Sequence, residues 1–260
     1  MPYAVRGDTS LYYETDGEGD PVAFVGDVGY GAWQWGWQHA AVAGPYESVV
    51  ADPRGSGRSD APAGPYAVET LTADLHAVLS DCGVRAAHLV GAGLGGMVAL
   101  QSALTSSRAR SLTLVGTAAS GAGLDLDPLF GDSDDPDALR ASLSAALSAS
   151  FVDEQPDAVE RIVAWRRDED ASREAWESQA AAVAGFDVSD SLFEVTVPAL
   201  VIHGTEDAVW PVERGRSLAE ELPRGEFVPA EGAGHLAHVE HSRHVNDALV
   251  GFLDAQSERN

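Results

Sequence analysis

Short runs of apolar, often β-branched residues recur along the chain, and each ends at or beside a Gly, Asp, His or Pro. Such runs are typical of buried strands. Eight strands are expected, at residues 3–6, 11–14, 22–25, 48–51, 87–90, 112–115, 199–202 and 226–228. The turn-rich spacer Gly7–Ser10 predicts that the first two form an antiparallel hairpin.

Segments with helical periodicity separate the later strands. Their ends carry helix start and stop residues, such as Pro211 before one helix and Gly83 after another. The expected helices span residues 68–82, 94–105, 212–222 and 241–256. The alternation of strands and helices predicts the α/β class, with a mostly parallel central sheet covered by helices on both faces. In such sheets ligands bind beyond the carboxyl ends of the strands, so the functional residues are expected there.

The strand signal lapses between about residues 124 and 190. Asp-, Ser- and Ala-rich sequence takes its place, with helical patches at 139–151 and 158–167. This segment holds 17 acidic and 5 basic residues, so most of its charge is expected to face solvent. We interpret residues 124–190 as a helical cap, inserted into a single α/β core that residues 1–123 and 191–260 form together.

The charge balance is strongly acidic. The chain has 41 Asp and Glu against 16 basic residues, all of them Arg, which gives a formal net charge of −25. A surface this negative repels phosphate backbones and anionic lipids, so neither nucleic acid nor a membrane is expected as a partner. It also repels itself unless salt screens it, which suggests a salt-rich, halophile-like cytoplasm. A bias toward arginine combined with an acidic solvated surface is the alternative explanation.

The cysteine content and the length of the apolar runs indicate what kind of protein this is. Cys82 is the only cysteine, so no internal disulfide can form, and its place on a predicted helix favours packing over redox chemistry. The chain shows no signal-peptide pattern and no apolar run near the roughly 20 residues of a membrane span. We expect a soluble, cytoplasmic protein whose partner is a small-molecule ligand or substrate.

Four short motifs follow predicted strands. An arginine-glycine turn of the form D-x-R-G-x-G-x-S spans Asp52–Ser59. Gly91–Gly95 lies between a strand and a helix, as the nucleophile elbow G-x-S-x-G does, with Gly93 in the serine position. An acid ends the turn Gly204–Asp207, and a histidine ends the loop Gly232–His235. The order elbow, acid, histidine links the last three.

These motifs and their order resemble the α/β-hydrolase family, in particular its esterases and enol-lactonases. The resemblance extends over about residues 22–253, and it implies a structural role for the arginine-glycine turn and no cofactor. The site residues that it implies are the base His235, the acid Asp207, the oxyanion-hole amides of Val28 and Leu94, and Gly93 at the nucleophile position.

Two other interpretations of the motifs have less support. Residues 91–96 also satisfy G-x-G-x-x-G, a dinucleotide-binding pattern, but the acid expected about 20 residues later is missing from Val115–Thr117. Three further histidines lie between residues 238 and 244, but no acidic ligands accompany them in a metal-binding pattern. No metal is therefore expected.

A glycine at position 93 excludes covalent attack from that residue, because it has no hydroxyl group. Three functions remain open. The space left by the missing hydroxymethyl group can hold a water that His235 and Asp207 activate, which gives hydrolysis of a small ester, lactone or similar bond. His235 can instead move a proton on a carbonyl ligand, as in a lyase or isomerase. The third function is a catalytically inactive small-ligand binder, in which glycine relaxes the strained elbow.

The loop after the third strand contains an acid, Asp27, where the family usually has a small residue. Asp27 is either a turn residue that caps the next helix or an acid or base of the site. Trp33 lies close to this loop and Trp210 lies just past the predicted acid, so both are candidates for an aromatic pocket. The alternative is that these tryptophans pack the cap and a helix against the sheet.

Overall fold

The computed structural model describes residues 2–257, which form an eight-stranded sheet in the order β1-β2-β4-β3-β5-β6-β7-β8. The hairpin β1–β2 and the pair β2–β4 are antiparallel, and the remaining pairs are parallel. The strands are β1 (Tyr3–Arg6), β2 (Thr9–Asp16), β3 (Asp20–Val25), β4 (Tyr46–Ala51), β5 (Ala87–Ala92), β6 (Ala109–Val115), β7 (Ala199–Gly204) and β8 (Gly225–Ala230). All eight predicted strands are present. The first turn is shorter than predicted, because Arg6 already pairs with Thr9.

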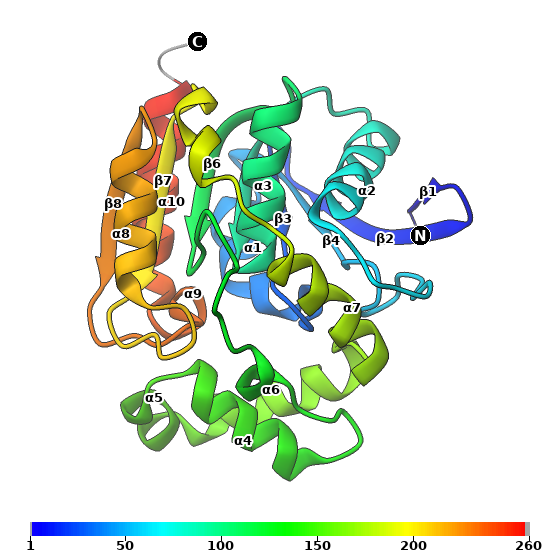
Figure 1. Ribbon diagram of the computed structural model, residues 1–260, viewed down its shortest axis with the longest axis vertical. Helices are drawn as coiled ribbons and strands as arrows, with labels where there is room; N and C mark the ends of the chain where they lie inside the picture. The colour runs from blue at the N-terminus through cyan, green and yellow to red at the C-terminus, as the bar shows by residue number, and fades with distance from the viewer. Residues whose placement is uncertain (1, 258–260) are drawn as a thin grey trace.

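Helices cover both faces of the sheet, as the alternating pattern predicts. In Figure 1, α2, α3 and α8 lie in front of the strands and α1 and α10 lie behind them. The two faces have separate apolar cores, one of which includes Leu100 of α3 and Leu218 of α8, and the other Leu249 of α10. These helices are α1 (Gly36–Val42), α2 (Val68–Asp81), α3 (Leu94–Thr105), α8 (Val212–Glu221) and α10 (Ser242–Ser257). The α/β prediction is confirmed.

The segment between β6 and β7, predicted as the cap, is helical. It contains η2 (Asp127–Leu129), α4 (Pro136–Ala146), α5 (Ala149–Glu154), α6 (Pro156–Glu169), α7 (Arg173–Ala184) and η3 (Ser189–Glu194). Figure 1 shows α4, α5 and α6 as a layer beyond the end of the sheet at which the β7–α8 loop lies. The patch predicted at 139–151 is two helices, because the Ser148 side chain accepts the Phe151 N–H and starts α5.

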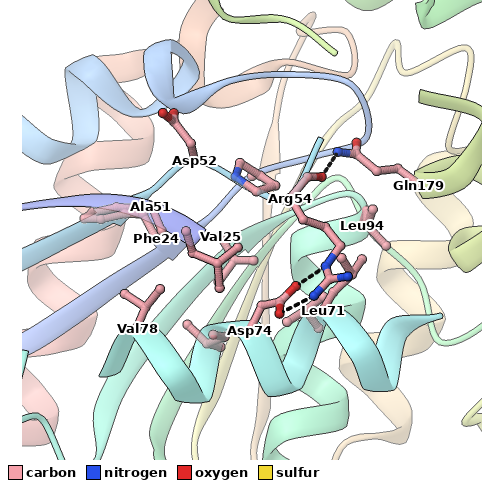
Figure 2. Close-up of a pocket in the computed structure, with 15 residues that line it drawn as sticks. Phe24, Val25, Ala51, Asp52, Arg54, Leu71, Asp74, Val78, Leu94 and Gln179 are labelled. Carbon is pink, nitrogen blue, oxygen red and sulfur yellow. Dashed lines mark hydrogen bonds and ion pairs between the residues drawn. The ribbon is translucent and has the colours of Figure 1, made fainter. Parts of the chain in front are cut away.

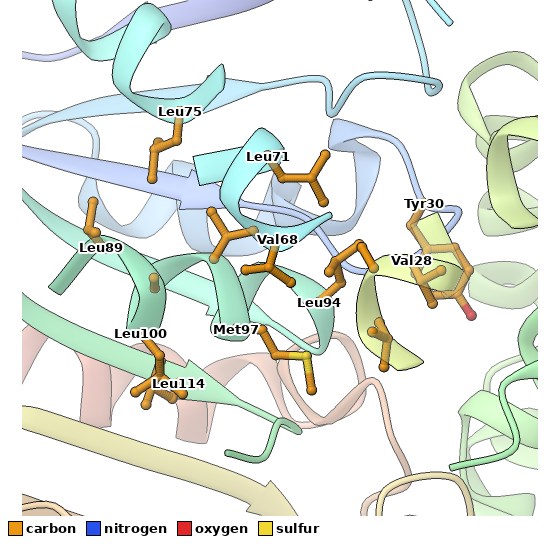
Figure 3. Packing of buried hydrophobic residues seen from close by; sticks show 14 of the residues in the cluster. Val28, Tyr30, Val68, Leu71, Leu75, Leu89, Leu94, Met97, Leu100 and Leu114 are labelled. Carbon is orange, nitrogen blue, oxygen red and sulfur yellow. The ribbon is translucent and has the colours of Figure 1, made fainter. Parts of the chain in front are cut away.

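The helix after the elbow is buried on every side. Met97 and Leu100 of α3 lie in the same apolar cluster as Leu71 of α2, as Figure 3 shows. Val28 and Tyr30 from the β3–η1 loop belong to this cluster too, and each is at most 1% exposed. The loop that the resemblance assigns to the oxyanion hole is therefore part of the core, and its backbone is fixed by packing.

Within residues 2–257, no helix combines the length and the apolar character that a membrane crossing requires.

Candidate active site

The elbow places Gly93 between β5 and α3, at the carboxyl end of a central strand. Its φ is 46° and its ψ is −113°, a conformation that glycine adopts freely and that costs other residues about 1–3 kcal/mol. Both of its backbone polar groups are paired. The Gly93 N–H donates to Val115 O at 3.0 Å, and Thr117 Oγ1 donates to Gly93 O at 2.7 Å. The glycine thus keeps the sharp strand-to-helix turn of an elbow.

The space beside Gly93 is filled by the carboxylate of Asp27. A Cβ added at residue 93 would overlap with the Oδ1 and Cγ atoms of Asp27. Asp27 is fully buried, so no solvent competes for its oxygens. The structure thereby corrects the expectation that a water fills the space left by the missing hydroxymethyl group, because a side chain from another loop already lies there.

The same carboxylate occupies the two backbone amides that the resemblance assigns to the oxyanion hole. Asp27 Oδ1 accepts the N–H of Val28 at 2.7 Å and the N–H of Leu94 at 2.8 Å. Leu94 is the first residue of α3, so Asp27 does cap a helix, but it caps the elbow helix rather than the helix that follows it in sequence. The amides converge on one point, and an anion of the protein is bound there.

His235, in the loop after β8, lies between two carboxylates. Its Nδ1 is 2.8 Å from Asp207 Oδ2, and its Nε2 is 2.7 Å from Asp27 Oδ2. Ionised carboxylates only accept hydrogen bonds, so both ring nitrogens donate and the ring is an imidazolium. Burial by itself lowers the pKa of His235, but Asp207 first and Asp27 next outweigh it and raise that pKa to about 10.

Asp207 follows β7 and is held from several sides. Its Oδ1 accepts the N–H groups of Val209 at 2.9 Å and Trp210 at 2.8 Å, which fixes the carboxylate in the orientation that faces His235. Burial raises the pKa of Asp207, but His235 and His203 more than offset this and hold the pKa below its usual range. Asp207 is therefore an anion that orients the ring of His235 and stabilises its positive charge.

Trp210 completes the surroundings of the histidine. Its ring is fully buried and stacks on that of His235, with 6.1 Å between centroids and 13° between planes. The structure thus brings together the predicted residues around two side chains. Asp27 contacts Gly93, Val28, Leu94 and His235, and His235 also contacts Asp207 and Trp210.

A buried base-acid pair beside a glycine elbow and two convergent amides suggests the family, and comparison with known proteins decides it. The family model of the alpha/beta hydrolase fold matches residues 29–242. The chain belongs to the α/β-hydrolase family.

Two relatives illustrate the similarity in sequence. A protein of Azorhizobium caulinodans, provisionally named as the carbamate hydrolase RutD, is 29% identical over 97% of this chain and 98% of its own. The 3-oxoadipate enol-lactonase 2 of Acinetobacter baylyi is 26% identical over 95% of this chain and 94% of its own. The chain is therefore similar to α/β-hydrolases whose names are those of hydrolytic enzymes.

Comparison with solved structures also finds similarity to hydrolytic enzymes. The enol-lactonase from Burkholderia xenovorans LB400 has a TM-score of 0.87 at 26% identity, with 97% of this chain and 100% of that chain covered. Est816, described as an N-acyl homoserine lactone degrading enzyme, has a TM-score of 0.84 at 27% identity, with 96% and 100% covered. This α/β-hydrolase thus shares its fold, over nearly the whole chain, with these two enzymes.

In this α/β-hydrolase the segment predicted as the cap is hydrogen-bonded to the β3–η1 loop through Gln179 of α7. Gln179 is fully buried; its Oε1 accepts the Gly29 N–H at 2.6 Å and its Nε2 donates to Arg54 O at 2.8 Å. Figure 2 shows the second of these bonds. No sequence motif indicates Gln179, because its partner Gly29 is 150 residues away and an amide on a helix is not a recognisable signal. The only indication in the sequence would have been an amide side chain on the face of α7 that is buried.

A second link joins the cap to the histidine loop. Glu240 Oε1 accepts the Gly234 N–H at 2.7 Å, next to His235, and Glu240 Oε2 accepts the Ser148 N–H at 3.0 Å at the start of α5. Both loops that hold the site are thus tied to cap helices by buried or half-buried hydrogen bonds.

The remaining pocket candidate, Trp33, lies in a different place. Its N–H donates to Glu169 Oε2 and its Nε1 donates to Asp170 Oδ1, each at 2.9 Å, which ties η1 (Ala32–Trp35) to the end of α6. Trp33 also lines a groove of about 420 Å³ with Trp37 and Trp165. None of the residues that line this groove is Gly93, Asp27 or His235, so Trp33 serves the contact between core and cap rather than the site.

A small cavity lies next to the oxyanion loop. It has a volume of about 50 Å³ and is lined mostly by apolar residues, among them Leu94, Leu71 and Phe24, as Figure 2 shows. The guanidinium group of Arg54 pairs with Asp74 at its edge, with 2.6 Å between Nη2 and Oδ1. This volume exceeds that of one water but is far below the roughly 300 Å³ of a small ligand site, so the cavity is a packing feature.

Proposed function

We propose that this α/β-hydrolase hydrolyses a small ester, lactone or similar bond through water activated by His235 and Asp207, without a serine nucleophile. The observation that carries the proposal is the convergence of three groups on one point. The Nε2 of His235 and the amides of Val28 and Leu94 all bond to the Asp27 carboxylate, which lies beside Gly93 at the nucleophile position. A proton-transfer group and two oxyanion donors in this arrangement are what hydrolysis of an acyl or ester bond requires.

The charge state of the site sets a condition on this chemistry. His235 is protonated while both carboxylates face it, and an imidazolium cannot take a proton from water. It becomes a base once the negative charge of Asp27 is removed or moved away, because the raised pKa depends partly on that charge. Catalysis therefore requires a substrate-dependent change at Asp27.

A second candidate function is a catalytically inactive binder. It is favoured by one observation, namely that both oxyanion amides are already satisfied by Asp27 in a site where Asp27 is fully buried and His235 is 2% exposed. In that case the Asp27 carboxylate would occupy the two oxyanion amides permanently and no substrate oxygen would bind to them.

Turnover of a defined panel separates the two functions. The purified protein is assayed with p-nitrophenyl acetate, ethyl acetate, γ-butyrolactone and β-butyrolactone. We expect turnover of at least one member, and a loss of about 100-fold or more in His235→Ala. The control is His244→Ala, which removes an exposed histidine of α10 and is expected to leave turnover unchanged. No turnover of any member, or equal turnover in His235→Ala, overturns the proposal and leaves the binder.

A further inference from the structure

We propose that Asp27 is the covalent nucleophile of this site, supplied from the β3–η1 loop in place of a serine at the elbow. The inference rests on the proposed hydrolytic function and names the group that attacks the substrate. It also gives Gly93 a definite role, which is to leave room for a carboxylate that reaches the site from another loop.

The position of the carboxylate is the first argument. The Cγ and Oδ1 atoms of Asp27 lie where the Cβ of an elbow side chain would lie. Asp27 Oδ2 lies 2.5 Å from that Cβ position and 2.7 Å from His235 Nε2. The carboxylate thus has the spatial relation to the histidine that a nucleophile requires, although it comes from a residue 66 positions earlier in the chain.

The two oxygens of Asp27 differ in their partners, which is the second argument. Oδ1 accepts two backbone N–H groups, from Val28 and Leu94, whereas Oδ2 has His235 as its hydrogen-bond partner. Asp27 is fully buried, and a desolvated carboxylate is a stronger nucleophile than a hydrated one. Oδ2 is therefore the attacking oxygen, and Oδ1 is already seated in the oxyanion hole for the step in which charge develops on it.

The occupied amides also indicate the substrate class. An attack on an acyl carbon creates an oxyanion on the substrate, and here both donors are already bonded to Asp27 Oδ1. An attack on a saturated carbon creates no such oxyanion and needs only a leaving group that departs as an anion. The geometry thus favours substrates with an electrophilic saturated carbon, such as the alkyl carbon of a strained lactone.

The first step forms an ester and breaks one carbon–oxygen bond. A lone pair of Asp27 Oδ2 attacks the alkyl carbon of the lactone, and the bonding electrons leave with the lactone oxygen as a carboxylate. Asp27 is then a neutral ester, so His235 loses one of its two anionic partners and its Nε2 proton passes to the new carboxylate or to solvent. This is the substrate-dependent change at Asp27 that makes His235 a base.

The second step restores the enzyme. His235 Nε2 takes a proton from water, and the water oxygen attacks Cγ of the Asp27 ester. The charge develops on Oδ1, where the amides of Val28 and Leu94 hold it. The intermediate expels the alkyl oxygen, which takes the proton back from His235. The sum is lactone plus water to hydroxy acid, and the water oxygen remains on Asp27.

The test uses the full-length protein with one enantiomer of β-butyrolactone in H₂¹⁸O. We expect the product 3-hydroxybutyrate to have the opposite configuration, because one displacement at saturated carbon inverts it. After repeated turnovers, cleavage at arginine and mass analysis are expected to find ¹⁸O in the peptide that contains Asp27. The peptide Ser59–Arg85 of the same digest, which contains the buried Asp74, is the internal control and stays unlabelled.

Two variants sharpen the result. In His235→Gln the second step is blocked, and the protein mass is expected to increase by that of one lactone. In Asp27→Asn turnover falls at least 1000-fold, and no adduct forms. Turnover with ¹⁸O only in the product and none in Asp27 overturns the nucleophile but leaves the hydrolase. Absence of turnover in the native protein overturns both.

Discussion

Gly93 and Asp27 are predicted to be strongly coupled in stability. Substituting Gly93 by Ala adds a Cβ that overlaps with the buried Asp27 carboxylate, so one of the two must move. Asp27 cannot move without losing its hydrogen bonds to Val28, Leu94 and His235. In Asp27→Ala the overlapping atoms are absent, and the added Cβ has space.

The size of the coupling follows from these contacts. Hydrogen bonds to a charged group contribute about 1.5–3 kcal/mol each, so the loss of two of the three bonds costs about 3–6 kcal/mol. The positive φ of residue 93 adds about 1–3 kcal/mol in either background. Gly93→Ala should therefore cost about 4–9 kcal/mol in the native chain and about 1–3 kcal/mol in Asp27→Ala. The φ term is common to both backgrounds, so the expected coupling energy is about 3–6 kcal/mol.

Urea unfolding of the four proteins, followed by tryptophan fluorescence, measures this double-mutant cycle. Asp27→Asn is the matched control, because an amide has the same shape as the carboxylate and the overlap persists. Gly93→Ala is expected to remain costly in that background. If Gly93→Ala costs the same in the native chain and in Asp27→Ala, to within about 0.5 kcal/mol, the carboxylate does not lie against Gly93 and the reasoning is refuted.

Three further predictions concern pH, the cap and salt. The pKa of His235 rises from 6.5 to about 10 on folding, so its contribution to stability is complete below pH 6.5 and is lost toward pH 10. The difference in unfolding free energy between the native chain and His235→Gln should fall by up to about 1.4 kcal/mol per pH unit across this window, and a constant difference contradicts it. Gln179→Met leaves two buried backbone groups unpaired and should cost about 2–4 kcal/mol in urea unfolding, whereas the control Gln256→Met, which loses one bond within α10, should cost about 1 kcal/mol. The melting temperature should rise with molar KCl because the net charge is −25, and a flat curve removes the halophile hypothesis.

The fold was predictable from the chain because its signals are local. A strand such as Leu112–Val115 is a short apolar run, and a helix such as α3 is marked by its first and last residues. The elements that the pattern did not predict include η1, α1, α7 and α9 (Ala237–Glu240). Two of these are only four residues long, and α7 is rich in alanine, so its buried face has little apolar contrast with its exposed face.

The site was predictable only as far as its residues stand in motifs. Asp207 and His235 were predicted because each ends a recognisable turn, and the structure places them 2.8 Å apart. The position of the Asp27 side chain could not be predicted from a motif. An aspartate in a loop after a strand is usually a cap, and whether its carboxylate turns toward the next helix or toward α3 depends on contacts 67 residues apart in sequence.

The overlap between residue 93 and Asp27 also restricts how this site arose. A lineage that starts from the serine elbow of the family cannot gain the aspartate while the serine remains, because the two side chains would occupy the same volume. The serine must be lost before the aspartate appears, or in the same step. An intermediate with a glycine at residue 93 and a small residue at residue 27 would have neither side chain in this volume. Reversal to serine at residue 93 is blocked in the same way as long as Asp27 is present, because a serine side chain would overlap with its carboxylate.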